Sequence, residues 1–183
     1  MEFIAFWIGI VGVCLSFLSY QQKRRRNIIT INIVSRFLFV LQYALVGAFE
    51  GAMLDLVGAI AATITQQKSR PFVQRHLRLV MVAVYVMIFG SVLPLYQNFL
   101  SFFPAIGVAL HITAFWLNDE KRIRQVSLLG CPFWFTYNLC NRAYGALVGD
   151  VTTISSLIIA MLRYDFHVFS SKKKSKQQLH SSL

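Results

Sequence analysis

The chain has 183 residues, of which 56% are hydrophobic and only 14% are charged. A soluble domain carries nearly twice that charged share, so the composition excludes an ordinary soluble protein and indicates an integral membrane protein. The formal net charge of +11 is typical of some nucleic-acid-binding proteins. Here, however, the basic residues stand in short clusters between long apolar runs, as the positive-inside rule describes, so no binding to nucleic acid is expected.

Seven apolar stretches approach the roughly 20 residues that a helix needs to cross the hydrocarbon core of a bilayer. The helices predicted from them are 3–20, 28–47, 51–67, 77–93, 99–117, 125–142 and 145–166. The expected fold is an all-α membrane protein with one seven-helix domain over residues 1–169. The segment 170–183 is polar and basic without an apolar period, which predicts a disordered tail.

Lys and Arg residues alternate between the predicted loops. The loops after the first, third and fifth helices carry 4, 4 and 3 of them, and the C-terminal side carries 5. The loops after the second and fourth helices carry none. The positive-inside rule therefore predicts a multi-pass protein of a bacterial inner membrane with a periplasmic N-terminus and a cytoplasmic C-terminus. Anionic lipid headgroups are the expected partners of the basic loops and tail.

The third and last predicted helices match each other at an offset of 95 positions without a gap. Asp55 falls on Asp150, and Lys68 falls on Arg163. The offset predicts two parallel three-helix repeats, at about 3–68 and 99–166, joined by a linker helix at about 77–93. Parallel repeats of this kind form one known transporter architecture, in which the solute binds between the repeats near the midplane.

This 3+1+3 plan is similar to that of the SWEET sugar transporters and the PnuC vitamin transporters, in architecture rather than in motif. A closer resemblance rests on four motifs, which are Gly9-Ile10-Val11-Gly12, Leu45-Val46-Gly47, Trp134-Phe135-Thr136-Tyr137-Asn138 and Tyr144-Gly145-Ala146. Through these motifs, and over nearly its full length, the chain resembles the YgjV family of small bacterial inner-membrane proteins. The resemblance implies a fold and a compartment, but it does not imply an activity.

Arg36 is a cation within a predicted membrane helix, where ionisable groups usually face a cavity or a partner. It lies about nine residues into the second helix, which is about 14 Å from the cytoplasmic end and near the midplane. Asp55 is the expected partner of its guanidinium, and Asp150 is the alternative. A structural ion pair and a direct contact to a solute both agree with this position.

Asp55 and Asp150 each lie about six residues into their predicted helices. As repeat-related carboxylates they would flank a central pathway and bind a cation, a proton or a polar solute. The alternative is an interfacial role near a helix N-terminus, where an acid is stabilised by the helix dipole. For Asp150 that alternative includes a helix cap, if the last helix begins late.

Uncharged polar side chains form a further candidate site on the second and sixth helices. They are Gln42, Tyr43, Tyr137, Asn138 and Asn141. Such groups often form hydrogen bonds between membrane helices, and the alternative is a contact to a solute. Trp134 is a candidate for stacking on a solute ring or for simple packing. His111 is a candidate proton relay or a core histidine with a satisfied ring.

The sequence carries no motif of a known catalytic or metal site, and Cys14, Cys131 and Cys140 do not have metal-ligand spacing. No enzyme, cofactor or metal is therefore expected. The leading prediction is a transporter or facilitator for a small solute that the sequence does not identify. The alternatives are a structural or regulatory membrane protein without transport and, third, a membrane enzyme. The sequence leaves a homo-oligomer open.

The two leading predictions differ in what should lie between the repeats. A cavity lined by Asp55, Asp150, Tyr137 and Asn138 would favour transport. A packed interface in which Arg36 is paired with Asp55 would favour a structural role.

Overall fold

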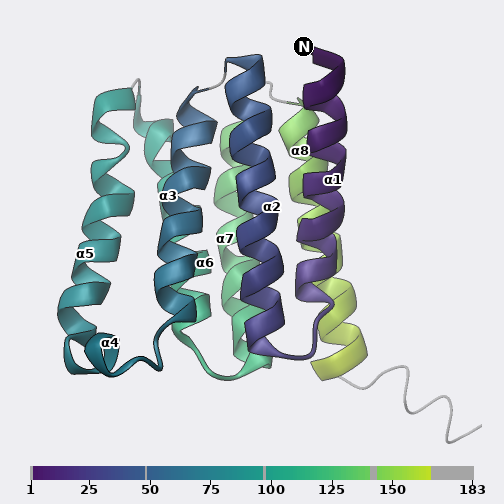
Figure 1. Ribbon diagram of the computed structural model, residues 1–183. Coiled ribbons are helices and arrows are strands. Elements are labelled where there is room, and N and C mark those ends of the chain that lie inside the picture. The colour runs from purple at the N-terminus through teal and green to yellow at the C-terminus, as the bar shows by residue number, and fades with distance from the viewer. Residues whose placement is uncertain (1, 48, 97, 141–143, 166–183) are drawn as a thin grey trace, which may run out of the picture.

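The computed structural model describes residues 2–47, 49–96, 98–140 and 144–165, and these form a bundle of helices (Figure 1). The α-helices are α1 (Glu2–Tyr20), α2 (Arg25–Val46), α3 (Phe49–Gln66), α4 (Pro71–Arg75), α5 (Leu77–Gly90), α6 (Phe102–Trp116), α7 (Glu120–Cys140) and α8 (Tyr144–Ala160). Two short 3-10 turns, Leu93–Leu95 and Phe99–Ser101, connect α5 to α6. A π-helical turn, Met161–Asp165, follows α8.

The all-helical class is confirmed, and each of the seven predicted helices has a counterpart. Several predicted bounds were wrong. α2 begins at Arg25 and α7 at Glu120, because charged residues assigned to loops form their first turns. α5 ends at Gly90, and the predicted loop after α3 contains α4, whose first residue is proline. Proline suits that position because its fixed φ is helical and its missing N–H would have no partner there.

The predicted helix ends at 142 and 166 and the predicted tail at 170–183 lie outside the described residues.

Four segments are long and apolar enough to cross a membrane, judged by length and composition within the described residues. They are Phe3–Tyr20, Arg25–Val46, Phe99–Trp116 and Ala146–Asp165. Gly51–Gln66 and Leu77–Gly90 are apolar but shorter. Large hydrophobic side chains point outward along the bundle, such as Leu79, Val82 and Val86 on α5, which are more than half exposed. An outer surface of this kind is stable against lipid and costly in water.

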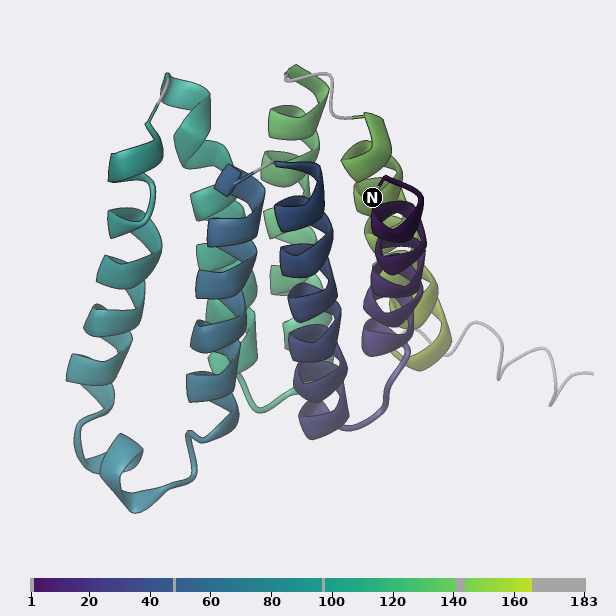
Figure 2. The same cartoon turned by 45° about the horizontal axis from the view of Figure 1, so that its top comes forward.

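The helices form two rows. α1, α2 and α3 pack in sequence order in one row, here called the first half, and α6, α7 and α8 form the second half. The rows face each other so that α1 packs on α8 and α3 packs on α6 (Figures 1 and 2). α5 packs outside the two rows, against α3 and α6. This arrangement leaves the middle helices, α2 and α7, opposite each other across the centre.

The bounds of the helices reproduce the offset found in the sequence. α2 and α3 begin at residues 25 and 49, and α7 and α8 begin at residues 120 and 144, so both pairs of starts differ by 95. The packing agrees, because the offset relates the contact of α3 with α6 to the contact of α8 with α1.

Each half also brings a glycine against an aromatic ring at matching positions. A Cβ atom added to Gly12 of α1 would lie 2.9 Å from the ring of Phe39 on α2. A Cβ atom added to Gly107 of α6 would lie 2.6 Å from the indole of Trp134 on α7. These two pairs are 95 positions apart, and in both the absent side chain lets the aromatic ring lie directly on the neighbouring helix.

The clusters of Lys and Arg lie at the end of the bundle where residues 21–24, 67–70 and 117–119 connect the helices, and this end is called the basic end. The other end, at Glu2, Gly47 and Leu93–Leu95, is called the opposite end. Gly47 terminates α2 there with a left-handed φ of 77°, a conformation that glycine adopts without strain.

At the basic end, an arginine of each half binds the last carbonyls of the first helix of the other half. Arg25 Nε donates to the oxygens of Phe115 (3.1 Å) and Leu117 (2.9 Å) at the end of α6. Arg124 donates to the oxygens of Tyr20 (3.3 Å) and Gln22 (3.0 Å) after α1. Helix ends leave these carbonyls without partners, so the two guanidinium groups complete them and join the halves.

Two further contacts strengthen this end. Arg124 Nη1 forms a buried ion pair with Asp165 Oδ1 at 2.8 Å. Lys68 Nζ donates to the Trp116 oxygen at 2.8 Å and also binds Asn118 Oδ1. Burial, with the positive charge of Arg25 as the second cause, lowers the pKa of the Lys68 amine to about 8. Arg25, Arg124 and Lys68 therefore join the two halves at the basic end.

Candidate functional site

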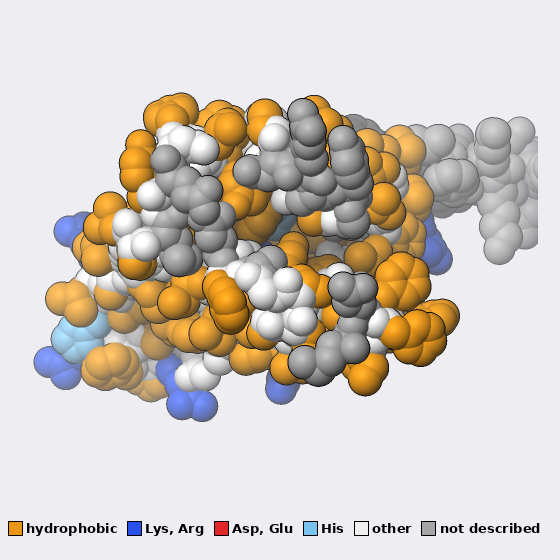
Figure 3. Space-filling view, turned by 90° about the horizontal axis from the view of Figure 1, so that it is seen from above, with side chains coloured by type: hydrophobic (Ala, Val, Ile, Leu, Met, Phe, Trp, Pro, Cys, Tyr) orange, Lys and Arg blue, Asp and Glu red, His pale blue; other side chains and the backbone are white. Residues whose placement is uncertain are grey.

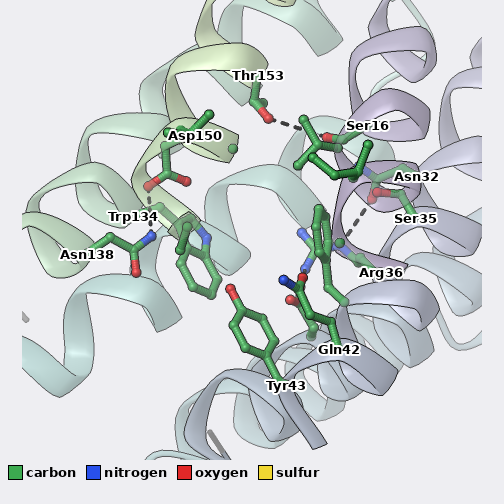
Figure 4. Close-up of a pocket in the computed structure, with 18 of the residues that line it drawn as sticks. Ser16, Asn32, Ser35, Arg36, Gln42, Tyr43, Trp134, Asn138, Asp150 and Thr153 are labelled. Atoms are coloured by element: carbon green, nitrogen blue, oxygen red, sulfur yellow. Dashed lines mark hydrogen bonds and ion pairs between the residues drawn. The ribbon is translucent and has the colours of Figure 1, made fainter. Parts of the chain in front are cut away.

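A cavity of about 360 Å³ lies between the two halves. Its lining comes from α1, α2, α3, α6, α7 and α8. The polar and charged residues of the lining are Ser16, Tyr20, Asn32, Ser35, Arg36, Gln42, Tyr43, Asp55, His111, Trp134, Asn138, Asp150 and Thr153. Figure 4 shows Asp150 and Asn138 on one side of the cavity and Arg36, Asn32 and Ser35 on the other.

The cavity is closed at the basic end and accessible from the opposite end. Along α1, the exposed fraction of the lining side chains falls from 58% at Phe6 to 8% at Ser16 and 1% at Tyr20. Below Tyr20, Ile28 of α2 and Ile123 of α7 are fully buried. Figure 3 looks onto the opposite end, where mostly hydrophobic and uncharged described side chains surround a hollow between the helices.

Arg36 is paired with Asp55 in the lining of this cavity. Arg36 Nη1 lies 2.8 Å from Asp55 Oδ1, and Arg36 Nε donates to Asn32 Oδ1 at 3.1 Å. The structure thus decides between the two predicted partners in favour of Asp55. The pair needs Gly58 beside it, because a Cβ atom there would lie 2.5 Å from Arg36 Nη1. The side chains are 8% and 10% exposed, so the two charges are desolvated together.

Asp150 stands in the lining, where its described neighbours include no cationic partner. Asn138 Nδ2 donates to its Oδ2 at 2.7 Å. Within the described residues no Lys, Arg or His nitrogen lies within 4.0 Å of this carboxylate. α8 begins at Tyr144, so Asp150 lies well inside the helix and the alternative of a helix cap is wrong. The repeat-related acids therefore differ, because among the described residues Asp55 has a cationic partner and Asp150 has none.

The other predicted site residues divide between the lining and the helix contacts. Gln42 and Trp134 line the cavity, and their side chains rest on Gly9 and Gly107. Tyr137 is half-buried on α7 and is not among the lining residues, whereas Tyr43 is. Asn141 lies outside the described residues.

His111 lines the cavity from α6, and its ring is engaged by the backbone. His111 Nδ1 lies 2.8 Å from the carbonyl oxygen of Gly107. Gly130 of α7 permits this position, because a Cβ atom there would lie 2.8 Å from the same nitrogen. This contact agrees with a buried histidine whose ring is held by a hydrogen bond to the backbone. The use of His111 as a proton relay stays a prediction.

Sequence reasoning missed several lining residues. They are Phe6, Gly9, Ile10, Val13, Ser16, Tyr20, Asn32, Ser35, Phe39 and Thr153. The α1 members follow one another at gaps of one, three or four residues and so share one helix face, but most of them are apolar or aromatic and carry no signal of a site. Ser16 contacts Thr153 at 3.3 Å, and Ser35 donates to the Gly12 oxygen at 2.8 Å, so these hydroxyls also join the helices.

The described residues contain no group of three His, Cys, Asp or Glu side chains placed to hold a metal ion. Among the described residues, the cavity offers one carboxylate without a cationic partner, one neutralised ion pair and several aromatic side chains. These groups can bind a small polar molecule by hydrogen bonds and charge, with apolar contact to the rings.

Residues 3–167 match the family Imp-YgjV, which is described as a bacterial inner membrane protein. The chain matches no curated protein and no solved structure. The match covers most of the chain and agrees with its apolar, membrane-capable helices. The protein therefore belongs to the YgjV family of bacterial inner membrane proteins.

Proposed function

We propose that this protein transports a small solute across the bacterial inner membrane through the cavity between its two halves. The observation that carries the proposal is the cavity itself, of about 360 Å³, with Arg36, Asp55 and Asp150 in its lining. Ionisable groups within a membrane are costly to place, and those that face a cavity usually serve its contents. The volume lies in the lower part of the range of about 300–1,000 Å³ that small-molecule sites occupy.

The architecture supports a cycle of alternating access. In this proposal all seven long helices span the membrane, the two halves are parallel repeats, and the basic end faces the cytoplasm. The cavity would then be accessible from the periplasm and closed towards the cytoplasm by Tyr20, Ile28 and Ile123. Rocking of one half against the other would break the arginine contacts of the basic end and open the inner side.

The test begins with metabolite profiling of deletion and overexpression strains, followed by uptake of the accumulated or depleted solutes into proteoliposomes. We expect Asp150→Asn to reduce uptake strongly, and Asp55→Asn to reduce it as well, at equal amounts of folded protein. Asp119→Asn is the matched control, because that carboxylate is exposed at the basic end. Undiminished uptake in both cavity variants would overturn the assignment of this cavity as the pathway.

One observation favours the second candidate, a structural or regulatory membrane protein without transport. Arg36, Asp55 and Asn32 satisfy one another, as polar groups that only stabilise helix packing would do. In that case no solute would be taken up by proteoliposomes, and the Asp55→Asn variant would differ from the wild type in stability alone.

A further inference from the structure

The charges of the ionised groups in the cavity do not sum to zero. Arg36 and Asp55 neutralise each other at 2.8 Å. Asp150 has only the neutral amide of Asn138, at 2.7 Å. The remaining titratable group that carries a basic nitrogen in the lining is His111, and an imidazole is mostly neutral near pH 7. Counted over the described residues of the lining, the cavity therefore holds one net negative charge, on Asp150 of α8.

A lone carboxylate in a membrane-embedded cavity is costly unless a cation or water offsets it. The protein does supply a cation to the matching position of the other half, since Asp55 has Arg36. The residue that corresponds to Arg36 at the offset of 95 is Cys131, which carries no charge. Asp150 is thus the member of the pair for which the described residues supply no countercharge.

Aromatic side chains line the same cavity as this carboxylate. Trp134, Tyr43 and Phe39 all line the cavity. Figure 4 shows the indole of Trp134 and the ring of Tyr43 between Asp150 on one side and Arg36 on the other. Aromatic faces attract alkylated ammonium groups through the ring quadrupole, and an adjacent carboxylate adds a direct charge contact. Arg36 is tied to Asp55 and Asn32 at the far side, so its charge is screened from the same space.

We propose that the cavity binds a small organic cation, a substituted ammonium compound. The charge lies against Asp150, and the apolar body lies against Trp134 and Tyr43. The inference rests on the proposed function only in taking this cavity as the place where the solute binds. A neutral or anionic solute of the same shape would leave Asp150 without a countercharge, so the site discriminates by charge rather than by size.

Three isosteric probes test the proposal with the purified full-length protein in detergent. They are choline, its uncharged isostere 3,3-dimethylbutan-1-ol and the anion 3,3-dimethylbutanoate. A larger aromatic cation, benzyltrimethylammonium, extends the range of size. The thermal unfolding midpoint is measured against probe concentration, because a ligand that binds the folded state raises the midpoint in a saturable way. We expect at least one cation to do so, and the neutral and anionic isosteres to cause no saturable shift.

Variants assign the effect to the cavity. Asp150→Asn should weaken binding of the cation at least tenfold, and Trp134→Leu should weaken it severalfold. Asp119→Asn, which removes an exposed carboxylate at the basic end, should leave it unchanged. The proposal is overturned if no cation shifts the midpoint, if the neutral isostere binds as tightly, or if Asp150→Asn binds choline like the wild type.

The outcomes separate this inference from the proposed function. Binding of a cation without uptake into proteoliposomes would support the charge preference of the site and contradict transport. Uptake of a neutral or anionic solute, without binding of any cation, would support transport and contradict this inference.

Discussion

Arg36 and Asp55 are two opposite charges that the bundle removes from solvent as a pair. Removal of one member leaves the other uncompensated and costs about 3–5 kcal/mol, whereas removal of both is often close to neutral. We expect Arg36→Gln and Asp55→Asn each to lower the thermal unfolding midpoint in detergent, and the double variant to recover much of the loss. Thermal melts followed by circular dichroism check this. A double variant whose loss equals the sum of the two single losses would contradict the coupling.

A substitution at Gly58 tests the same Arg36–Asp55 ion pair without changing either of its two side chains. A methyl group there would lie 2.5 Å from Arg36 Nη1, so Gly58→Ala should push the guanidinium away from Asp55 and lower the midpoint in the manner of Arg36→Gln. Gly90→Ala is the matched control, because a Cβ atom at Gly90 meets nothing within 4 Å. Alanine in a helix is favoured over glycine by about 1 kcal/mol. Gly90→Ala should therefore be neutral or stabilising, and equal losses in both variants would contradict the role given to Gly58.

At the scale of the helices, the ends of α1 and α6 are completed from the opposite half. Arg124 and Arg122 lie on the same helix, α7, but only Arg124 is buried. Arg124→Gln removes a buried ion pair and two carbonyl contacts, so we expect a large fall in the unfolding midpoint. Arg122→Gln removes an exposed pair at 3.7 Å, which is worth about 0–1 kcal/mol. Similar midpoints for the two variants in thermal melts would contradict this contrast.

Lys68, which follows α3 and binds the end of α6, predicts a dependence on pH. Its pKa of about 8 in the folded protein lies below the ordinary value of 10.5. Between these values the unfolded chain binds more protons than the folded one, so this group makes the folded state more stable as the pH rises. We expect the midpoint of the wild type to rise relative to that of Lys68→Gln between pH 8 and pH 10. A difference that stays constant over this range would contradict the shift.

At the scale of the whole molecule, the gathering of the basic clusters at one end predicts an orientation in the membrane. In a variant with Cys14, Cys131 and Cys140 replaced by alanine, one new cysteine is placed at Leu93 or at Asp119. Leu93 is 70% exposed at the opposite end, and Asp119 is exposed at the basic end. A membrane-impermeant maleimide added to intact spheroplasts should label Leu93→Cys and spare Asp119→Cys until the membrane is opened. The reverse pattern would invert the proposed topology.

The sequence predicts the helices well because membrane helices are long apolar runs separated by charge. The wrong helix starts of α2 and α7 occur where charged residues belong to the first turn of a helix. Glu120 to Arg124 looks like a loop in composition, yet Arg124 is 2% exposed and belongs to a polar stripe with Ser127 and Asn138 on one face of α7. Composition alone does not separate a helix that begins with charges from a loop that ends with them. The spacing of the stripe would have done so.

The candidate site could be predicted only in part. The sequence places Arg36, Asp55 and Asp150 at suitable depths, but it leaves the partner of Arg36 open, since that choice depends on the distance between helices. The side of α7 that faces the cavity depends on the rotation of this helix about its own axis, which the sequence also leaves open. Asn138 lines the cavity and the adjacent Tyr137 does not, because neighbouring residues on a helix point about 100° apart. Whether these residues bind a solute stays a prediction.

The π-helical turn at Met161–Asp165 gives the end of α8 one residue more than a regular α-helical turn would hold. A π-turn absorbs this extra residue, so the residues on its two sides keep nearly the orientation that they would have in an uninterrupted α-helix. Asp165, the last residue of the turn, forms the ion pair with Arg124. Deletion of Leu162, which is 38% exposed, would let the turn relax to an α-helix and leave the direction of Asp165 nearly unchanged. The ion pair that holds Arg124, whose other contacts join the two halves at this end, should thus survive the loss of a single codon.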